Sequence, residues 1–522
     1  MSRWRSLSTF LLWSPAALGV TYLAVFLWKL PRLIDRLYWD SDAAVALVIA
    51  DTHNRGTTIL GHYGWFTNFW FTQITRPLPF HREIWEYMPY VVFLATMALL
   101  SWISWRVAGA WAAAMTATAA VSVSPFLAYV AASINFHSTT WAGTAVLAGF
   151  AFWLCRQESD ARKAIGTLVM AFFAGFTLAS DHLSAVTALI PLAGAGVLVL
   201  LRRESRVAGG AMVTVALAAI PIALLTEKLM HRLHFEVWSA EGKLAASSQR
   251  RPNLERFVDL LAVGTRGSDL RDPPVGIRGA LIDGSEAVFL LCLAVPFLLL
   301  VRELLTRDKS AARIAYCGFW AVSIAATAGA YVLSTFGSQP GYYLIAIYYA
   351  VAATLPLLSA LTPRLRPVAT ICVGILALTN LITLLDTKTA LHGGEQPIAA
   401  IAGQVLEIAQ RENAMKGYAD YWESSSLSWS SDMKLQVYAV TQCRSPALDL
   451  CPFWVNVSTN WYKESQGKSF LLRDTKSMSV KEPPPEKLGE PTSIHMLGPS
   501  FTLYVYPYDI SRHFDYSDFS PR

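Results

Sequence analysis

Asp40 and Asp42, in the segment Tyr38-Trp39-Asp40-Ser41-Asp42, have residue types and a spacing that suit proton transfer or cation binding. A carboxylate flanked by aromatic rings can act as a general base, and this interpretation is favoured for Asp40. An Asp-x-Asp pair also supplies the oxygen ligands that a divalent cation prefers, so such a cation is the candidate cofactor and these two residues are its candidate ligands. Asp42 precedes the apolar stretch 43–50, so capping of a helix is as well supported for it as a functional role.

The remainder of the same loop contains side chains that suit phosphate binding. Arginine and histidine neutralise phosphate groups, and Gly61 and Gly64 predict a turn that presents the histidine between them. A solvated loop is the alternative, and it is the preferred interpretation of Arg82 and Glu83. The candidates in this loop are His53, Arg55, His62 and Arg76.

Two more polar groups occur in short connections between apolar runs. The connection Ala179–Ser184 contains Asp181 and His182, and it is too short for a solvated loop. The alternative role is capping of the next helix, and function is slightly favoured for Asp181 and evenly balanced for His182. The uncharged segments 135–137 and 338–343, which include Tyr342, can line a pocket but do not identify one.

The elements that position these residues follow from the hydrophobicity of the chain. Hydrophobic residues make up 54% of its 522 positions and charged residues 15%, against roughly 25% charged in an average soluble domain. This composition excludes a disordered chain and argues against a wholly soluble one. Eleven runs are apolar and long enough to predict membrane-spanning helices. They are 9–29, 86–105, 109–130, 139–155, 164–180, 184–201, 207–226, 285–301, 314–334, 342–361 and 368–386.

Basic residues in the short loops predict the orientation of these spans. With the N-terminus in the cytoplasm, the inside loops hold all the short-loop lysines and arginines, and the outside loops 131–138, 181–183 and 335–341 hold none. We expect an integral protein of the plasma (inner) membrane, with the C-terminal region outside the cytoplasm. The inside residues are Arg3, Arg5, Arg106, Arg156, Arg162, Lys163, Arg202, Arg203, Arg206, Arg302, Arg307, Lys309, Arg313, Arg364 and Arg366.

Two domains are predicted from this map. Residues 1–386 form a transmembrane domain with outer loops at about 30–85 and 227–284, and residues 387–522 form a small extracytoplasmic α+β domain. Helical spacing predicts a helix over 396–411, and alternation predicts strands over 434–440, 470–472 and 501–506. The large aromatic residues of this domain form either its core, which is favoured, or a carbohydrate-stacking surface. They are Trp422, Trp429, Trp454, Trp461 and Tyr462.

The six cysteines agree with this topology. Cys443 and Cys451 lie eight positions apart in the outer tail, where an oxidising compartment favours a disulfide between them. The other four lie in or beside predicted spans, and no cysteine or histidine spacing suggests a zinc site.

The layout resembles that of the GT-C superfamily of membrane glycosyltransferases. The resemblance rests on Asp40-Ser41-Asp42 after the first span, with support from Ala179–Ser184, and on the topology of the whole chain. It implies transfer of a sugar from a polyprenyl-phosphate carrier on the outer face of the membrane, with Asp40 as the catalytic base and Asp42 as its partner. It implies an envelope polysaccharide, a glycolipid or a protein as the acceptor.

One family feature is missing from this sequence. Many bacterial relatives have an Arg-Tyr pair before a late span, whereas this chain has Gly341-Tyr342-Tyr343 at that place. The donor phosphate is then expected to meet a cation elsewhere, at Arg55, Arg76 or in the loop 227–284. The residues expected to bind donor or acceptor are His53, Arg55, His62, Arg76, Asp181, His182 and Tyr342.

Two other functions are weighed against this one. A secondary transporter or lipid flippase would usually show inverted repeats and polar groups at the middle of the membrane, and neither is evident. A non-catalytic envelope scaffold would leave the outer acids unexplained. The net charge of +6 does not indicate a nucleic-acid partner, because many of the basic residues lie in the inside loops.

Overall fold

The computed structural model describes residues 2–52, 57–61, 65–131, 137–238, 243–266, 276–306, 310–335, 341–385, 397–443, 449–475 and 484–516. The main helices are α1 (Ser2–Leu37), α2 (Ser41–Thr52), α3 (Trp65–Thr75), α4 (His81–Val121), α5 (Pro125–Ala131), α6 (Ser138–Leu154), α7 (Asp160–Ser180), η1 (Ala185–Leu189), α8 (Ile190–Leu200), α9 (Arg206–Arg232), α10 (Ser247–Arg266), α11 (Ile277–Cys292), α12 (Val295–Leu305), α13 (Ala311–Leu333), η4 (Gly341–Leu344), α14 (Ile345–Thr354), α15 (Leu358–Leu361), α16 (Arg366–Leu385), α17 (Pro397–Glu412) and α18 (Tyr421–Ser430). The strands are β1 (Thr58–Gly61), β2 (Phe235–Trp238), β3 (Lys416–Asp420), β4 (Gln436–Gln442), β5 (Leu450–Pro452), β6 (Val457–Ser458), β7 (Ser469–Asp474), β8 (Ser493–Leu497) and β9 (Phe501–Tyr506).

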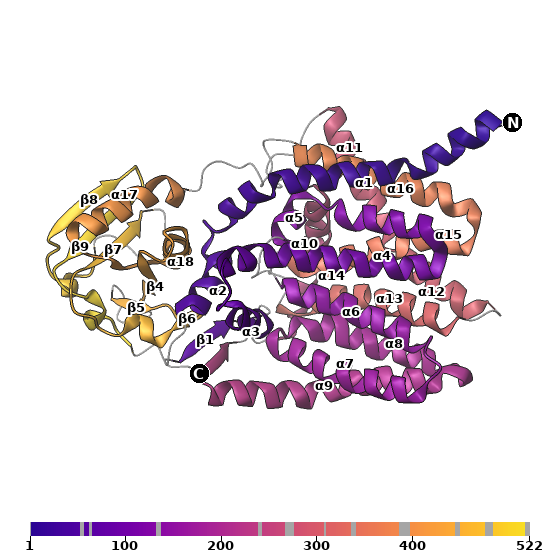
Figure 1. The fold of residues 1–522 in the computed structure, drawn as a ribbon, viewed down its shortest axis with the longest axis horizontal. Helices are drawn as coiled ribbons and strands as arrows, with labels where there is room; N and C mark the ends of the chain where they lie inside the picture. The colour runs from indigo at the N-terminus through magenta and orange to yellow at the C-terminus, as the bar shows by residue number, and fades with distance from the viewer. Residues whose placement is uncertain are drawn as a thin grey trace. The chain divides into compact units, whose positions relative to one another are not determined.

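The chain divides into two compact units, each built from three separate segments (Figure 1). The helical unit comprises Met1–Pro31, Tyr87–Thr226 and Ala240–Gly393. The mixed unit comprises Arg32–Glu86, Glu227–Ser239 and Gly394–Arg522, and it contains both helices and strands. Most of the predicted outer loop 30–85 therefore belongs with the C-terminal region, whereas the predicted outer loop 227–284 is divided: Glu227–Ser239 belongs with it and the remainder belongs to the helical unit.

Helices long and apolar enough to cross a membrane confirm the predicted fold class. Within the described residues there are seven of them, and two shorter apolar stretches at Ala185–Leu200 and Ile345–Leu361. All eleven predicted runs fall on helical segments. The run 86–105 lies within α4, and the run 109–130 continues from α4 across residues 122–124 into α5. Helix α4 bends at Gly109, where φ is +84° and a side chain would be strained.

Within the helical unit, α13 packs against α6, α8, α10, α12 and α14. Its large aromatic residues Tyr316 and Trp320 are fully buried. Helices α8 and α9 approach closely where Gly196 meets Gly209: a Cβ built on Gly209 would lie 2.7 Å from the carbonyl oxygen of Gly196. Small residues at such a crossing let two backbones touch inside a membrane.

The mixed unit contains two sheets. The smaller sheet has the strand order β2-β1-β6, with β1 parallel to β2 and antiparallel to β6. The larger sheet has the order β5-β4-β3-β7-β9-β8, and β3 is parallel to both β4 and β7. The apolar face of α17 packs into its core, which includes Ile401, Val405, Phe470 and Leu503.

The predicted α+β character of the C-terminal region is confirmed. Helix α17 and strands β4, β7 and β9 lie where the sequence pattern placed them. Strands β3 and β8 and helix α18 were not predicted. The predicted Cys443–Cys451 disulfide is present, and Cys155, Cys292, Cys317 and Cys372 are free thiols.

Candidate functional site

Asp40 is the N-cap of α2. Its carboxylate accepts a hydrogen bond from the backbone N–H of Asp42 at 3.0 Å, and its carbonyl accepts from the N–H groups of Ala43 and Ala44 at 3.1 Å each. The sequence allows Asp42 as the N-cap of this helix, but in the structure the N-cap is Asp40. The carboxylate of Asp42, two residues further along, is therefore available for other contacts.

Asp42 lies at the end of a chain of hydrogen bonds within the mixed unit. The hydroxyl of Tyr421 donates to its carboxylate at 2.7 Å and accepts from Nδ2 of Asn456 at 3.3 Å. The amide oxygen of Asn456 in turn accepts from the backbone N–H of Gly61 at 2.8 Å. Since Tyr421 and Asn456 are both buried, this chain fixes the orientation of a half-buried carboxylate.

The environment of Asp42 makes its carboxyl group unusually basic. Burial raises its pKa most, donation from Tyr421 lowers it, and the neighbouring carboxylate of Asp40 raises it again. The result is a pKa of about 6, against an ordinary value of 3.8. A carboxylate that titrates near neutral pH is well matched to accept a proton during a reaction.

The sequence around α18 positions Tyr421. Asp420 ends β3 and caps α18, accepting from the N–H of Trp422 at 3.2 Å. Ser41 then joins the two helix starts: its hydroxyl donates to the carbonyl of Trp422 at 2.9 Å and accepts from the N–H of Ser426 at 3.3 Å. The first turns of α2 and α18 are thus held together, which brings Tyr421 to Asp42.

Arg76 and Arg82 lie at the other end of α2 from Asp42. Arg76 is exposed, and its guanidinium donates to the carbonyl of Asp51 at 2.7 Å. Arg82 pairs with Asp51 at 3.2 Å and with Asp432, and it lies over the ring of Trp429 at 4.5 Å. These contacts join α2, α4 and α18, so the solvated loop predicted for Arg82 and Glu83 is wrong: both lie in the first turn of α4, and Arg82 is half-buried and paired.

Four other predicted site residues lie wholly or partly outside the described part of the chain. His53, Arg55 and His62 lie outside the described residues. Tyr342 lies in η4, but its side chain is outside the described part.

A second polar cluster lies in the helical unit around Asp181, which is 1% exposed. Its carboxylate contacts Nδ1 of His137 and accepts hydrogen bonds from the hydroxyl of Thr140 and from the N–H of Leu183, the latter at 3.0 Å. The hydrogen bond from the N–H of Leu183 corresponds to the helix-capping role that the sequence also allows for Asp181. The ring of His137 lies 4.9 Å from that of Tyr343.

The histidine beside Asp181 is therefore His137, while the adjacent His182 is exposed. His137 had been noted only as part of an uncharged outer loop. A buried carboxylate needs hydrogen-bond donors or a positive charge nearby. This requirement is the signal by which the sequence points to a histidine in a neighbouring predicted loop as the partner of Asp181.

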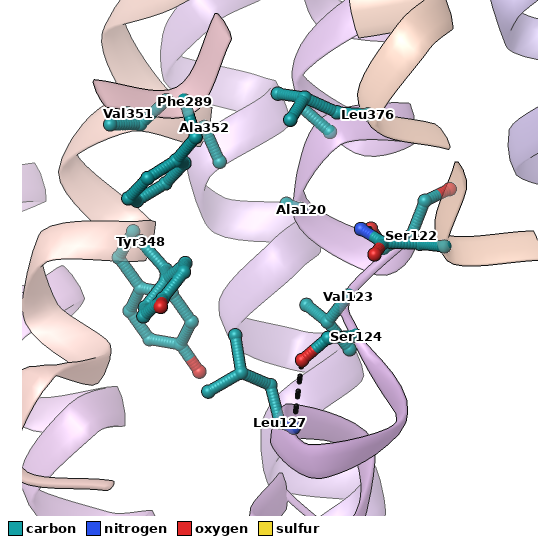
Figure 2. Close-up of a pocket in the computed structure, with 13 residues that line it drawn as sticks. Ala120, Ser122, Val123, Ser124, Leu127, Phe289, Tyr348, Val351, Ala352 and Leu376 are labelled. Atoms are coloured by element: carbon teal, nitrogen blue, oxygen red, sulfur yellow. Dashed lines mark hydrogen bonds between the residues drawn. The ribbon is translucent and has the colours of Figure 1, made fainter. Parts of the chain in front are cut away.

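Two apolar pockets lie in the helical unit and share lining residues. In the first, Figure 2 shows Phe289 and Tyr348 facing Ser122, Val123 and Ser124. The second has Phe93, Trp141 and Ile345 among its lining residues. The residues common to both linings are Val123, Leu127, Tyr348 and Tyr349.

The second pocket reaches the Asp181 cluster. Trp141 lines this pocket, and its ring lies 5.8 Å from that of His137. An apolar space thus ends beside a buried ionisable pair, which is the arrangement that an amphipathic ligand would need.

Among the described residues, no three or more His, Cys, Asp and Glu side chains are grouped closely enough to hold a metal ion. The assignment of Asp40 and Asp42 as cation ligands stays a prediction.

No protein-family model matches the sequence, and no curated protein matches it. Among solved structures, the chain is similar to the crystal structure of ArnT from Cupriavidus metallidurans bound to undecaprenyl phosphate, with 15% sequence identity and a TM-score of 0.44. The match covers 93% of this chain and 97% of that chain.

Proposed function

We propose that this integral membrane protein is a glycosyltransferase that moves a sugar from a polyprenyl-phosphate carrier to an acceptor of the cell envelope. The observation that carries the proposal is the Asp42 carboxylate, which is half-buried, accepts a hydrogen bond from the hydroxyl of Tyr421 at 2.7 Å and has its pKa raised by burial. Transfer of a sugar to a hydroxyl group needs such a base. The GT-C resemblance of the sequence supports the same reaction.

In the proposed mechanism, Asp42 is the base in place of Asp40. Its carboxylate accepts the proton of the acceptor hydroxyl as that oxygen attacks the anomeric carbon of the donor sugar. The bond from this carbon to the phosphate oxygen breaks, and polyprenyl phosphate leaves. Asp40 holds the start of α2, while Tyr421 and Asn456 keep the carboxylate of Asp42 in place.

The apolar pockets of the helical unit support a lipid-linked donor. Their linings offer carbon surfaces to an isoprenoid tail, with few polar groups. The pair Asp181 and His137 would lie near the polar end of such a lipid. Arg55 and the loop 227–284 stay the predicted contacts of the donor phosphate, whereas Arg76 donates to the carbonyl of Asp51 at the end of α2 away from Asp42. The proposal includes the predicted orientation, with the mixed unit on the outer face of the plasma membrane.

The test uses the full-length protein in nanodiscs with radiolabelled polyprenyl-phosphate sugars and an envelope extract as acceptor. Asp42→Asn should lower transfer by at least about a hundredfold, because it removes the proton acceptor and keeps the shape. Asp40→Asn is the matched control. Asparagine caps a helix as well as aspartate does, so this variant should keep most of the activity.

Three results would contradict the proposal. Equal transfer by the parent and by Asp42→Asn would remove Asp42 as the base. Release of no polyprenyl phosphate by the parent with any donor would overturn the enzyme class, and lipid movement across the bilayer without transfer would indicate a flippase. Treatment with EDTA tests the predicted cation at Asp40 and Asp42, since a required cation would make transfer depend on added Mg²⁺ or Mn²⁺.

A further inference from the structure

The large aromatic residues of the C-terminal region fall into two groups by exposure. Trp429, Trp461 and Tyr462 are buried, with at most 4% of their surface exposed, as the core interpretation predicted. Trp422 is 55% exposed and Trp454 is 38% exposed. Exposed large aromatic rings that lie together mark binding surfaces more often than chance positions.

These two tryptophans are the ends of one row of rings. The ring of Trp422 meets Tyr421 edge-on at 5.3 Å, Tyr421 stacks on Phe453 at 4.5 Å, and Phe453 stacks on Trp454 at 5.8 Å. We call these four residues the aromatic row. Segments from α18 and from the stretch after β5 thus form one row of contacting rings, in which the end members Trp422 and Trp454 are exposed, Phe453 is half-buried and Tyr421 is buried.

The aromatic row contacts the proposed base, Asp42, through Tyr421. Its second member, Tyr421, is the residue whose hydroxyl donates to the Asp42 carboxylate at 2.7 Å. The backbone of its first member, Trp422, accepts a hydrogen bond from Ser41, the residue directly before Asp42. A molecule stacked on Trp422 would therefore lie on the residue next to the hydrogen-bond partner of Asp42.

The backbone that carries the aromatic row is firmly held. The disulfide from Cys443 to Cys451 joins β4 to β5, and the N–H of Phe453 donates to the carbonyl of Ala439 at 3.1 Å. Rigid aromatic side chains lose little conformational entropy on binding, which favours recognition.

We propose, building on the function above, that the acceptor is a saccharide whose pyranose or furanose rings stack on Trp422 and Trp454. The faces of aromatic rings carry negative charge and attract the slightly positive C–H groups on the flat face of a sugar. Spaced indoles at either end of one row suit a chain of sugars better than a single serine or threonine side chain. The proposal selects a polysaccharide or the sugar part of a glycolipid over a protein acceptor.

The binding test measures quenching of tryptophan fluorescence in the full-length protein. The probes are mannotetraose, arabinotetraose and a threonine-rich peptide of similar length. At least one saccharide should bind, and Trp422→Ala/Trp454→Ala should weaken its binding about tenfold or more, as loss of central aromatic anchors usually does. Because removing these residues also removes their fluorescence, binding to the variants is measured by calorimetry.

Two variants control for folding and for general apolar exposure. Trp422→Phe keeps an aromatic face and should retain most of the affinity. Ile494→Ala, at an equally exposed position (57%) on β8 of the same unit, should bind the saccharide as the parent does.

The outcomes separate this inference from the proposed function. Asp42→Asn should bind the saccharide normally while losing transfer, and the double tryptophan variant should raise the acceptor KM about tenfold while donor binding is unchanged. If the parent transfers sugar but the double variant keeps its saccharide affinity and KM, the inference is wrong. It is equally wrong if no saccharide binds, if the peptide binds at these tryptophans, or if brominated lipids quench them and so place them in the bilayer interface.

Discussion

Two aspartates separated by one residue have different environments in this protein. The carboxylate of Asp40 accepts a hydrogen bond from the backbone of α2, whereas the carboxylate of Asp42 accepts one from the hydroxyl of Tyr421. The charge of Asp40 acts on Asp42 through space and raises its pKa. Asp40 can therefore influence a reaction at Asp42 without contacting the substrate.

The pH dependence of transfer should reveal this coupling. Transfer needs Asp42 ionised, so activity should rise with pH around the pKa of about 6. Asp40→Asn removes the negative charge that raises this pKa, so the acidic limb of the profile should move to lower pH. Measurement of kcat against pH for the parent and this variant checks the direction.

Tyr421→Phe provides the opposite change. It removes the hydrogen bond that lowers the pKa of Asp42, so the acidic limb should move to higher pH. If both variants shift the limb in the same direction, or neither shifts it, Asp42 is not the titrating group.

The sequence predicts the segment of the site but not its partners. Asp40 and Asp42 are noticeable because two acids follow the first apolar run. Tyr421 lies 379 residues further along the chain, and nothing in its local pattern distinguishes it from other tyrosines of that region. The assignment of the cap to Asp40 depended on where α2 begins, and helix ends are predicted only to within a few residues.

At the scale of elements, the apolar helices are predictable because hydrophobicity alone determines them. Strand β3 (Lys416–Asp420) and helix α18 were missed for a different reason. The sequence KGYAD has no alternating pattern, and it forms a strand because β4 and β7 pair with it on both sides. The serine-rich sequence of α18 is stabilised by its cap and by packing, which local propensity does not report.

The crossing of α8 and α9 yields a prediction with a neighbouring control. Gly209→Ala would place a Cβ 2.7 Å from the carbonyl oxygen of Gly196 and 2.8 Å from the backbone nitrogen of Leu200. Since these are backbone atoms, the helices must separate, at a cost of about 1–3 kcal/mol. The thermal unfolding temperature in detergent should fall.

Gly210→Ala is the matched control, because a Cβ there meets nothing within 4 Å. This variant gains helix propensity without a clash and should unfold at the parent temperature or slightly higher. Equal effects of the two variants would show that α8 and α9 do not cross closely at Gly209.

At the scale of the whole molecule, the units differ from the domains that the sequence predicts. A single boundary at 386 follows from hydrophobicity, which separates apolar from polar segments. Strand pairing instead joins Thr58–Gly61, Phe235–Trp238 and Val457–Ser458 into one sheet, so two loop segments belong to the mixed unit. Such pairing between distant segments has no signature in the composition of any one of them.

The proposed orientation predicts which exposed positions an impermeant reagent can reach. In a background with Cys155, Cys292, Cys317 and Cys372 replaced by alanine, Gln466→Cys should react with a charged maleimide added to intact cells. Glu158→Cys should react only after the cells are opened, because its loop is predicted to lie in the cytoplasm. Both positions are exposed, so a reversed labelling pattern would mean that the topology is inverted.

The three-stranded sheet also determines when during biosynthesis the site can exist. A ribosome completes β1 long before it reaches β6, and the nascent chain holds a strand edge without its partner in the interval. Over much of the same interval, Asp42 lacks its hydrogen-bond donor Tyr421, which is synthesised 379 residues later. A chain truncated before residue 456 would keep every predicted membrane span but would lack Asn456 and β6. The hydrogen-bond chain that orients the carboxylate of Asp42 is thus completed only late in synthesis.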